Sequence, residues 1–487
     1  MKTVTPESMG ISSKDIMDYI NLLEEYQLAT HNVIIARGDS IIYEQYWAPF
    51  HQDFLHRQYS VSKSVVSIAV GFAQQDGLLS LDDPISKYFP EETKNSEHTF
   101  SQTIRNMLTM ENEAVGRGWF HARPNDLVQY YFDNPFYQSR PAGTIFEYDS
   151  TGCFILCALV ERLTGRKFMD YLREKLFDEI GVSQEAHCLA CPGGHSWGDS
   201  AILCKPTDML KIAKFVMSKG KWNGRQILDE DYLTAATACQ VQATTGNQYG
   251  YSSHGYGYFI WRTWDNSFSF NGMGSQFAIC VPDKELILIY NGDNQGNAIA
   301  NTIIFDGFFR LVARKASPTP LPENPASVSL LNQPRKLHYA KNDHPSSFQE
   351  KVSGAVYALE PNPMGITKLS LDFSHPQCRL NYTNAQGDKT ILFGMGENTF
   401  DIFPEEGYSD QVGSQRTTGH YYRCAASAAW TEEKKLFIQV QIIDTYFGRL
   451  NITLSFQDEN TLGIYMNKTA EDFMDTYQGF ASGKRVM

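Results

Sequence analysis

Strand-like runs at both ends of a long helical stretch constrain the fold of this chain more than any other feature. Two β-rich runs flank the turn sequence Arg37-Gly38-Asp39-Ser40 near the start, and three more follow at residues 256–261, 276–281 and 286–290. Between them, from about residue 103 to 219, apolar residues recur with helical spacing. This order predicts an antiparallel sheet flanked by helices, an inserted helical subdomain, and a cleft where the two meet.

A change of pattern divides the chain near residue 316. The stretch that follows has no periodicity and is typical of a linker, with prolines at Pro318, Pro320, Pro322 and Pro325. Short β-rich runs come later, at Leu369–Phe373, Thr390–Phe393, Leu436–Ile442 and Asn451–Phe456. We therefore expect an α/β (α+β) domain at 1–315 with its helical subdomain at about 85–225, a linker at 316–334, and a C-terminal antiparallel sheet or barrel at 335–487.

Composition limits the partners and the compartment. The net charge of -13 and the lack of any basic run argue against a nucleic-acid or anionic-membrane partner, so we expect a small-molecule partner. Neither a signal-peptide core at the N-terminus nor an apolar run of membrane-spanning length occurs, which favours a cytoplasmic protein. The nine cysteines are an odd number scattered along the chain, and this fits reduced thiols better than a disulfide framework.

The clearest catalytic candidate is Ser60 with Lys63, which open an apolar helical pattern running to Asp76-Gly77. Residues three apart lie on the same face of a helix, so Lys63 could take the proton of the Ser60 hydroxyl. The start of a helix favours an alkoxide or oxyanion, and burial could keep Lys63 neutral enough to act as a base. The alternative is a helix cap followed by a surface lysine.

Two further segments carry candidate chemistry. Tyr148, within Glu147-Tyr148-Asp149-Ser150, precedes a buried helical run, and near a lysine its phenol could shuttle a proton; the alternative is a core tyrosine. The segment from Phe270 to Gln276 has glycines that let a substrate approach the backbone closely, and the Met273 N–H could face an oxyanion. The alternative for this segment is a bulged hairpin loop.

In order and spacing, these three motifs resemble those of the serine β-lactamase and penicillin-binding-protein superfamily. The likeness is to its class C-like branch, which includes esterases, D-amino-acid peptidases and oligomer amidases, and it covers about residues 1–315. The first motif is Ser60-Val61-Ser62-Lys63, and the Tyr-x-Asn motif appears as Tyr148-Asp149-Ser150. The Lys-Thr-Gly motif is replaced by Phe270-Asn271-Gly272, and Phe270 cannot donate to a substrate carboxylate.

The resemblance implies a β-lactamase/transpeptidase-like fold and a serine hydrolase that forms an acyl-enzyme on Ser60, with Lys63 and Tyr148 moving the proton. The backbone N–H groups of Ser60 and Met273 would hold the oxyanion, and neither a metal nor an organic cofactor is required. The expected substrate-binding residues are Ser150, Asn271, Gly272, Gly274, His195 and Trp197. The altered third motif and the Gly-x-Gly-x-Gln form favour an ester, amide or peptide substrate.

Three alternatives remain open at this point. A β-lactamase or D,D-carboxypeptidase would use the same serine, whereas a binding or sensor protein would keep the scaffold without turnover. The segment from His187 to His195 could also be written as a zinc site through Cys188 and Cys191, although a loop at the rim of the cleft is favoured. Core packing is the favoured role of Trp119, Phe120 and His121, with pocket lining as the alternative.

Overall fold

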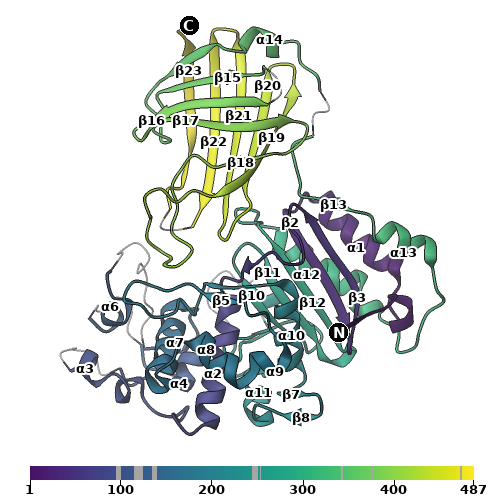
Figure 1. Ribbon diagram of the computed structural model, residues 1–487, viewed down its shortest axis with the longest axis vertical. Helices are drawn as coiled ribbons and strands as arrows, with labels where there is room; N and C mark the ends of the chain where they lie inside the picture. Colours follow the sequence, from purple (N-terminus) through teal and green to yellow (C-terminus); the bar gives the residue numbers. More distant parts are fainter. Residues whose placement is uncertain are drawn as a thin grey trace. The chain divides into compact units, whose positions relative to one another are not determined.

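The structure is a computed structural model of the 487-residue chain. It describes residues 1–94, 100–113, 124–133, 140–243, 250–252, 254–341, 344–374, 377–471 and 474–486. Trp119, Phe120 and His121 lie outside the described residues. Contacts divide the chain into two compact units, one comprising Met1–Leu337 with Asp410–Ser414, and the other His338–Ser409 with Gln415–Met487 (Figure 1).

The first unit is built on a mixed, mainly antiparallel sheet. Its strands follow the order β1 (Lys2–Thr3), β3 (Ser40–Ala48), β2 (Thr30–Arg37), β12 (Leu286–Gly292), β11 (Gln276–Val281), β10 (Phe268–Gly272) and β9 (Trp261–Arg262), and β13 (Arg335–Lys336) pairs with β3. Only the pairings of β3 with β1 and with β13 are parallel. Ile34 of β2 lies opposite Ile289 of β12, so strands from both ends of the segment pair, as predicted.

The strand predicted at residues 256–261 is mostly absent. Only Trp261–Arg262 joins the sheet, while Tyr256 makes isolated bridges to Val241 and Trp261. Phe259 has a φ of 56°, which lies in the left-handed region and interrupts an extended run. The prediction was wrong because the aromatic residues that raise β propensity here are buried in an irregular segment instead.

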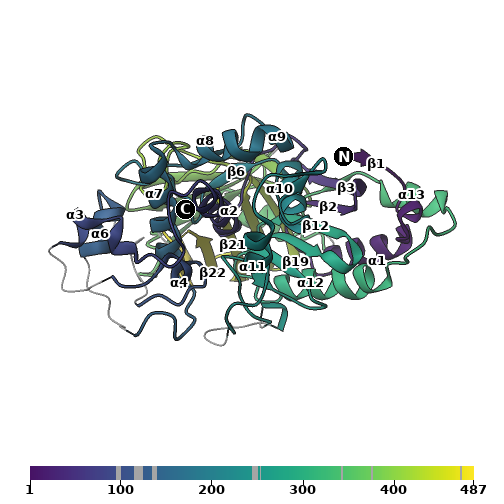
Figure 2. The ribbon, with the colours of Figure 1, turned by 90° about the horizontal axis from the view of Figure 1, so that it is seen from below.

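Helices cover both faces of this sheet, as expected (Figures 1 and 2). On one face, α1 (Ser13–Glu25) and α12 (Ala300–Leu311) pack on the sheet in a common core. The buried residues of α1 follow the helical repeat: Ile16, Tyr19, Ile20 and Leu23. On the other face, α10 (Pro206–Met217) contacts β11 and β12, and α2 (Val61–Gln75) contacts β10 and β11.

The segment predicted as a linker contains a helix, α13 (Pro325–Leu331), which packs against α1. Pro325 occupies the first turn, where its missing N–H removes no hydrogen bond, and the Asn324 side chain caps the helix by accepting from the Ser327 N–H at 3.2 Å. Leu331 is buried in the core of the first unit. Pro325 therefore starts a helix, so this part of the predicted linker is not only extended chain.

The segment between β4 and β9 is mainly helical, with α7 (Ser150–Thr164) at its centre. The helix is buried on nearly every side, is capped by Asp149, and ends at Gly165 with a φ of 67°. Besides α2 and α10, the α-helices that the structure describes in this segment are α3 (Pro90–Thr93), α4 (Ile104–Leu108), α6 (Leu127–Asp133), α8 (Phe168–Leu172), α9 (Asp178–Ile180) and α11 (Glu230–Thr237). Short strands are β4 (His56–Arg57), β5 (His187–Cys188), β6 (Ile202–Cys204), β7 (Lys221–Trp222) and β8 (Arg225–Gln226). Within the described ranges, no helix is both long and apolar enough to cross a membrane.

The second unit is a closed β barrel with one short helix, α14 (Gln349–Val352). Its strands are β14 (Val356–Leu359), β15 (Lys368–Asp372), β16 (Cys378–Asn384), β17 (Gly387–Met395), β18 (Thr399–Ile402), β19 (Arg423–Glu432), β20 (Lys435–Ile442), β21 (Gly448–Asp458), β22 (Thr461–Ala470) and β23 (Tyr477–Arg485). Neighbours are antiparallel, and a parallel pairing of β17 with β19 closes the barrel. The predicted small antiparallel β domain is confirmed.

One short segment, Asp410–Ser414, belongs by its contacts to the first unit although barrel strands lie on both sides of it in the sequence. The Ala190 N–H donates to the Gln411 carbonyl at 2.9 Å, and the Gly413 N–H donates to the Ala190 carbonyl at 3.0 Å. Gly413 is required because a Cβ there would lie 2.2 Å from the Trp197 ring. This segment therefore pairs with the loop that leads to Trp197.

Candidate active site

Ser60 is the N-cap residue of α2 and does not use its side chain as a cap. The preceding residue, Tyr59, is buried with a φ of 46°, a conformation that is unfavourable for a bulky side chain and recurs at functional sites. The Ser60 hydroxyl instead accepts a hydrogen bond from Lys63 Nζ at 2.8 Å. The structure thus excludes the reading of this pair as a cap and a surface lysine.

Lys63 is 1% exposed and is held on the Ser60 side of α2 by contacts from another segment. Its Nζ donates to the Asp199 carbonyl at 2.8 Å and lies 4.0 Å from Asp199 Oδ2. Burial lowers the pKa of Lys63, but Tyr148 and Asp199 offset this effect, so the net pKa is raised above its usual value. The expectation that burial keeps Lys63 neutral is therefore wrong for this arrangement, because the groups beside it stabilise the ammonium.

Asp199 is a site residue that the sequence reasoning missed. It is fully buried, and neither carboxylate oxygen has a hydrogen-bond partner in another residue that the structure describes. Burial raises the pKa of Asp199 to about 6, and the Lys63 charge opposes that rise. The residue before Asp199 must be a glycine in this position, because a Cβ on Gly198 would lie 2.4 Å from Cys157 Sγ. The only signal in the sequence was its place at the end of a glycine-rich loop, 136 residues from Lys63.

Tyr148 lies in the loop before α7 and comes near the other two candidates. The Lys63 ammonium lies 5.3 Å from the centroid of the Tyr148 ring, and the ring stacks on Trp261 with centroids 5.7 Å apart. Asp149 fixes the loop by accepting from the Thr151 and Gly152 N–H groups at 2.9 and 3.0 Å. Because Tyr148 is 36% exposed, the alternative of a core tyrosine fails. Ser60, Lys63 and Tyr148 are thus brought together from two distant segments.

The end of β10 lies close to the turn that precedes α2 and carries Ser60. A Cβ on Gly272 would lie 2.4 Å from the Gln58 carbonyl and 3.3 Å from Val61, so only glycine allows this approach. Gly274, with a φ of 72°, turns the chain, and Met273 between the two glycines is 40% exposed. The backbone therefore lies close to the Ser60 turn, and the segment forms the hairpin loop of the alternative reading; the close approach of a substrate to these glycines stays a prediction.

The side chains of the third motif take different positions. Phe270 is fully buried in the sheet, so it cannot replace the cation of a Lys-Thr-Gly motif. Asn271 is half-buried, and its Oδ1 meets no hydrogen-bond partner among the described residues. Ser150 is half-buried at the first position of α7, two residues after Tyr148. Asn271 is the polar side chain of the altered third motif, and Ser150 replaces the asparagine of the Tyr-x-Asn motif.

The family comparison agrees with this geometry. Residues 19–305 match the family model described as Beta-lactamase, which is more than half of the chain. The chain belongs to the Beta-lactamase family. The resemblance inferred from the three motifs is therefore confirmed, and the sheet and helical subdomain predicted from the sequence are those of a β-lactamase-family protein.

Curated relatives of this β-lactamase-family chain are distant. A 6-aminohexanoate-dimer hydrolase of Paenarthrobacter ureafaciens is 21% identical over 227 residues, which cover 44% of this chain and 58% of that enzyme. An uncharacterised protein of Alkalihalophilus pseudofirmus is 26% identical over 255 residues, covering 47% of this chain and 70% of that protein. The match to the hydrolase thus spans less than two thirds of its length.

Solved structures show the same fold over larger parts of the chain. The octameric penicillin-binding protein homologue from Pyrococcus abyssi has a TM-score of 0.50 at 14% identity, and the match covers 96% of this chain and 99% of that one. EstCE1, a hydrolase with promiscuous acyltransferase activity, has a TM-score of 0.50 at 14% identity, with 61% and 99% covered. The first of these extends the likeness in fold to nearly the whole chain.

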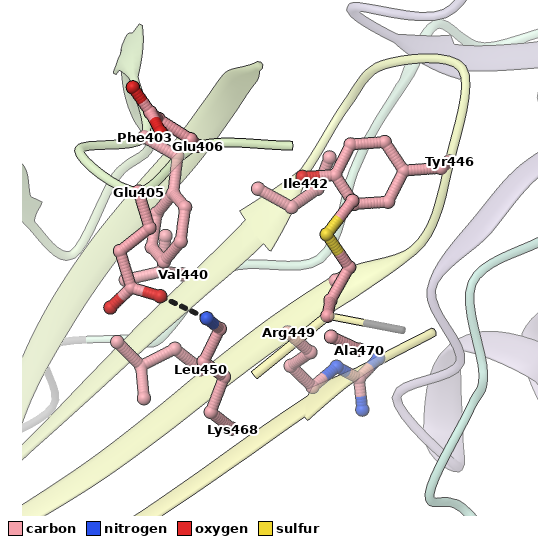
Figure 3. A pocket seen from close by; sticks show the side chains of 12 residues that line it. Phe403, Glu405, Glu406, Val440, Ile442, Tyr446, Arg449, Leu450, Lys468 and Ala470 are labelled. Atoms are coloured by element: carbon pink, nitrogen blue, oxygen red, sulfur yellow. Dashed lines mark hydrogen bonds and ion pairs between the residues drawn. The ribbon is translucent and has the colours of Figure 1, made fainter. Parts of the chain in front are cut away.

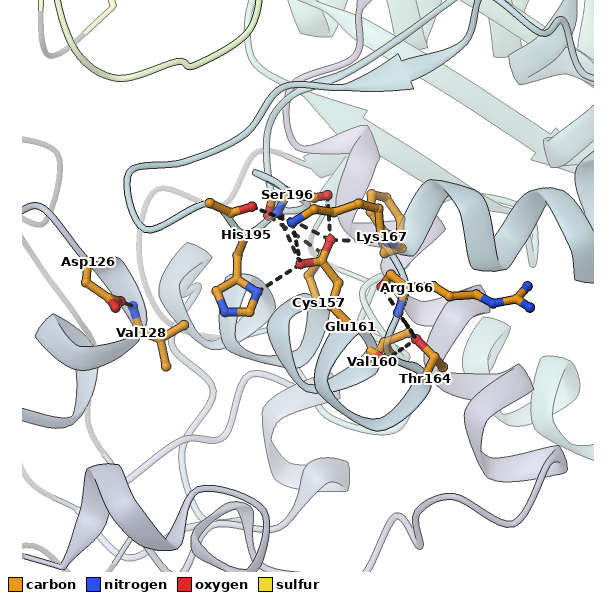
Figure 4. Close-up of polar contacts among 12 residues, drawn as sticks. Asp126, Val128, Cys157, Val160, Glu161, Thr164, Arg166, Lys167, His195 and Ser196 are labelled. Atoms are coloured by element: carbon orange, nitrogen blue, oxygen red, sulfur yellow. Dashed lines mark hydrogen bonds and ion pairs between the residues drawn. The ribbon is translucent and has the colours of Figure 1, made fainter.

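His195 and Trp197 have structural partners in this β-lactamase-family fold, and Figure 4 shows those of His195. His195 Nδ1 lies 2.8 Å from Glu161 Oε2, and Ser196 Oγ donates to Glu161 Oε1 at 2.6 Å. Burial raises the pKa of Glu161, but His195 and Ser196 more than offset this and lower it overall. Trp197 is buried beneath the Arg57 guanidinium, which lies 4.5 Å from its ring centroid. Both residues anchor the loop that carries Asp199, and a contact with substrate stays a prediction for each.

The zinc reading of the same loop finds no support. Among the described residues, no group of three or more His, Cys, Asp or Glu side chains is placed to hold a metal ion. Burial raises the pKa of the Cys188 and Cys191 thiols, as is typical of structural buried cysteines. His187 Nδ1 lies 2.9 Å from the Glu185 carbonyl, and His195 is taken up by Glu161.

Proposed function

We propose that this protein is a serine hydrolase that forms an acyl-enzyme on Ser60 and cleaves an ester or amide bond of a small substrate. The observation that carries the proposal is the 2.8 Å hydrogen bond from the buried Lys63 ammonium to a Ser60 hydroxyl that caps nothing. The Tyr148 ring beside the same ammonium adds a second group able to move protons.

The pKa directions suggest how the work is divided. Since the pKa of Lys63 is raised, Lys63 acts as a cation that stabilises the developing Ser60 alkoxide. Tyr148, after its own phenolic proton has passed to solvent, accepts the serine proton as a phenolate beside this cation. The alkoxide attacks the substrate carbonyl, and the backbone N–H groups of Ser60 and Met273 donate to the oxyanion. Tyr148 returns the proton to the departing alcohol or amine, and water then hydrolyses the ester on Ser60 with Tyr148 as base.

Substrate recognition follows from the altered third motif. Buried Phe270 supplies no cation for the carboxylate of a β-lactam, which favours esters, amides and short peptides. The distant likeness to a 6-aminohexanoate-dimer hydrolase supports an amide substrate. We assign substrate contacts to Ser150, Asn271, Gly272, Gly274, His195 and Trp197. A cytoplasmic location is supported by the nine cysteines, all of which are free.

The test is hydrolysis of a p-nitrophenyl acyl ester by wild type and by Ser60→Ala. We expect turnover to fall to the background rate in the variant, and a fluorophosphonate probe to label wild type only. Ser64→Ala is the matched control, because Ser64 lies on the same helix with its hydroxyl donating to the Phe259 carbonyl at 2.7 Å. Unchanged turnover or labelling in Ser60→Ala would refute the proposal.

A further inference from the structure

Arg57 is a buried cation beside the candidate active site, and the proton transfers proposed above do not use it. It lies on β4, three residues before Ser60, and is 3% exposed. Its backbone pairs with Leu203 of β6, so β4 joins the segment before Ser60 to the segment after Asp199. Burying a charge is unfavourable unless its surroundings compensate for the lost water, so the contacts of this side chain indicate its role.

The Arg57 side chain contacts the turn that leads to Ser60. Its guanidinium lies 4.3 Å from the centroid of the Tyr59 ring, a distance at which a cation and the face of an aromatic ring attract each other. Tyr59 is buried with a φ of 46°, and a residue in that region keeps its conformation only when its surroundings fix it. The contact with Arg57 therefore helps to fix the residue directly before Ser60.

The same guanidinium contacts the loop that carries Asp199. Arg57 Nε donates to the Ser200 carbonyl at 3.0 Å, and the guanidinium lies 4.5 Å from the centroid of the Trp197 ring. Trp197 and Ser200 lie on either side of Asp199 in the sequence, so Arg57 holds this loop before and after the carboxylate. Burial raises the pKa of Asp199 to about 6, and the charges of Lys63 and Arg57 oppose that rise.

Lys63 needs both of these segments in place at once. Its Nζ donates to Ser60 Oγ at 2.8 Å and to the Asp199 carbonyl at 2.8 Å. A shift of the Ser60 turn relative to the Asp199 loop lengthens one of these two hydrogen bonds. Since Arg57 contacts a chain neighbour of each bonding partner, it fixes the gap that the Lys63 ammonium bridges.

A buried cation of the second unit provides a contrast. Lys468 forms an ion pair with Glu405 inside the barrel (Figure 3). It also lies 5.6 Å from the ring centroids of Phe403 and Tyr477, which belong to the same barrel. These contacts stay within one unit and involve no candidate catalytic group, whereas Arg57 joins two segments of the candidate active site.

We propose that Arg57 is a positioning residue of the hydrolase, which holds the Ser60 turn and the Asp199 loop at the separation that lets Lys63 bind both. This inference rests on the function proposed for Ser60 and adds a residue that acts through Lys63 rather than on the substrate. Without Arg57, the ammonium stabilises the developing alkoxide less well, while binding of the substrate in its ground state is unchanged. The loss therefore falls on kcat rather than on KM.

The test is Arg57→Met in the full-length protein. Methionine keeps an apolar chain between the two rings but removes the charge and the hydrogen bond to the Ser200 carbonyl. For a p-nitrophenyl acyl ester we expect kcat to fall about 10- to 10²-fold and KM to change less than about twofold, because a misplacement of roughly 1 Å has an effect of this size. The rate of fluorophosphonate labelling of Ser60 should fall by the same factor.

Arg57→Lys is the conservative variant. It keeps a positive charge and an N–H donor, but an ammonium lacks the planar guanidinium that contacts both rings and the Ser200 carbonyl together. Its kcat should therefore lie between those of wild type and Arg57→Met.

Two controls separate positioning from lost stability. Leu23→Ala removes a buried side chain of α1 and destabilises the same unit, and Lys468→Gln removes a buried cation from the barrel. Both should turn over the ester as wild type does when rates are normalised to the folded fraction measured by circular dichroism. Hydrogen exchange adds a readout without turnover: peptides covering 58–63 and 197–203 should exchange faster in Arg57→Met and not in the controls.

The outcomes distinguish this inference from the function on which it rests. Turnover that depends on Ser60 but is unchanged in folded Arg57→Met overturns the role of Arg57 alone. So does wild-type exchange of both peptides in that variant, or an Arg57→Lys enzyme that is no faster than Arg57→Met. If Arg57→Met does not fold, Arg57→Lys decides, because wild-type kcat there overturns the inference. If wild type neither hydrolyses esters nor is labelled, the proposed function fails and the role of Arg57 fails with it.

Discussion

Replacing Asp199 with asparagine should stabilise this protein, and increasingly so as the pH rises. Burial raises the pKa of Asp199 from 3.8 to about 6, so the folded chain holds this proton more tightly than the unfolded chain does. The stabilising effect of proton binding is complete below pH 3.8 and is lost as the pH rises through 6. Ionised Asp199 therefore destabilises the fold at neutral and alkaline pH.

The size of the effect follows from the two pKa values. Linkage gives a destabilisation of about 2 kcal/mol at pH 5 and about 3 kcal/mol at pH 8, because each pKa unit corresponds to about 1.4 kcal/mol. Asparagine has nearly the same shape and cannot ionise. Asp199→Asn should therefore gain about 2 kcal/mol at pH 5 and about 3 kcal/mol at pH 8.

The assay is urea unfolding of wild type and variant at several values between pH 5 and pH 8, following the transition of the first unit by tryptophan fluorescence. Asp170→Asn is the control, because Asp170 is an exposed carboxylate in the first turn of α8 and its replacement should give a small, constant difference. The reasoning is refuted if Asp199→Asn is less stable than wild type at pH 8, or if the gain does not change with pH.

Three other substitutions test the site. Tyr148→Phe should lower kcat for a nitrophenyl ester about 10²- to 10⁴-fold with an unchanged melting temperature, since the ring is partly exposed; wild-type kcat would contradict its role in proton transfer. Gly272→Ala places a Cβ 2.4 Å from the Gln58 carbonyl, so we expect a loss of about 1–3 kcal/mol in stability by urea unfolding and slower turnover, and an unaffected variant would refute the close approach. Lys63→Met removes the cation beside Asp199 and should abolish fluorophosphonate labelling in a folded protein; retained labelling would show that Ser60 is activated without it.

Local patterns predicted the parts of the site that lie on single elements. Ser60 and Lys63 are one helical turn apart, so their contact follows from the helix alone, and the loop before α7 was visible from the helical run after Tyr148. Asp199 could not be predicted this way, because its approach to Lys63 depends on the packing of a loop against α2 and α7.

The protonation state of Lys63 could not be predicted from local sequence patterns either. Burial was predictable from the apolar helix, and taken alone it favours a neutral amine. The net direction reversed because Tyr148 and Asp199 come from segments far along the chain, and their positions exist only in the folded protein. The predicted strand near Phe259 failed in a similar way, since propensity does not reveal a left-handed residue fixed by its neighbours.

Three unusual features of the first unit lie around Ser60, and their placement together is an argument for function. Tyr59 has a positive φ, Lys63 is a cation in the interior, and Asp199 is a buried carboxylate that accepts no hydrogen bond from any other described residue. Tyr59 and ionised Asp199 lower the stability of the fold, and a fold selected only for stability has no reason to place both beside a buried cation and one hydroxyl. Their joint effect is to hold that hydroxyl against an ammonium whose charge is set by its neighbours, which is the arrangement that acyl transfer needs. If Asp199→Asn is more stable than wild type but turns over substrate more slowly, a single substitution will show that this carboxylate lowers stability and supports activity.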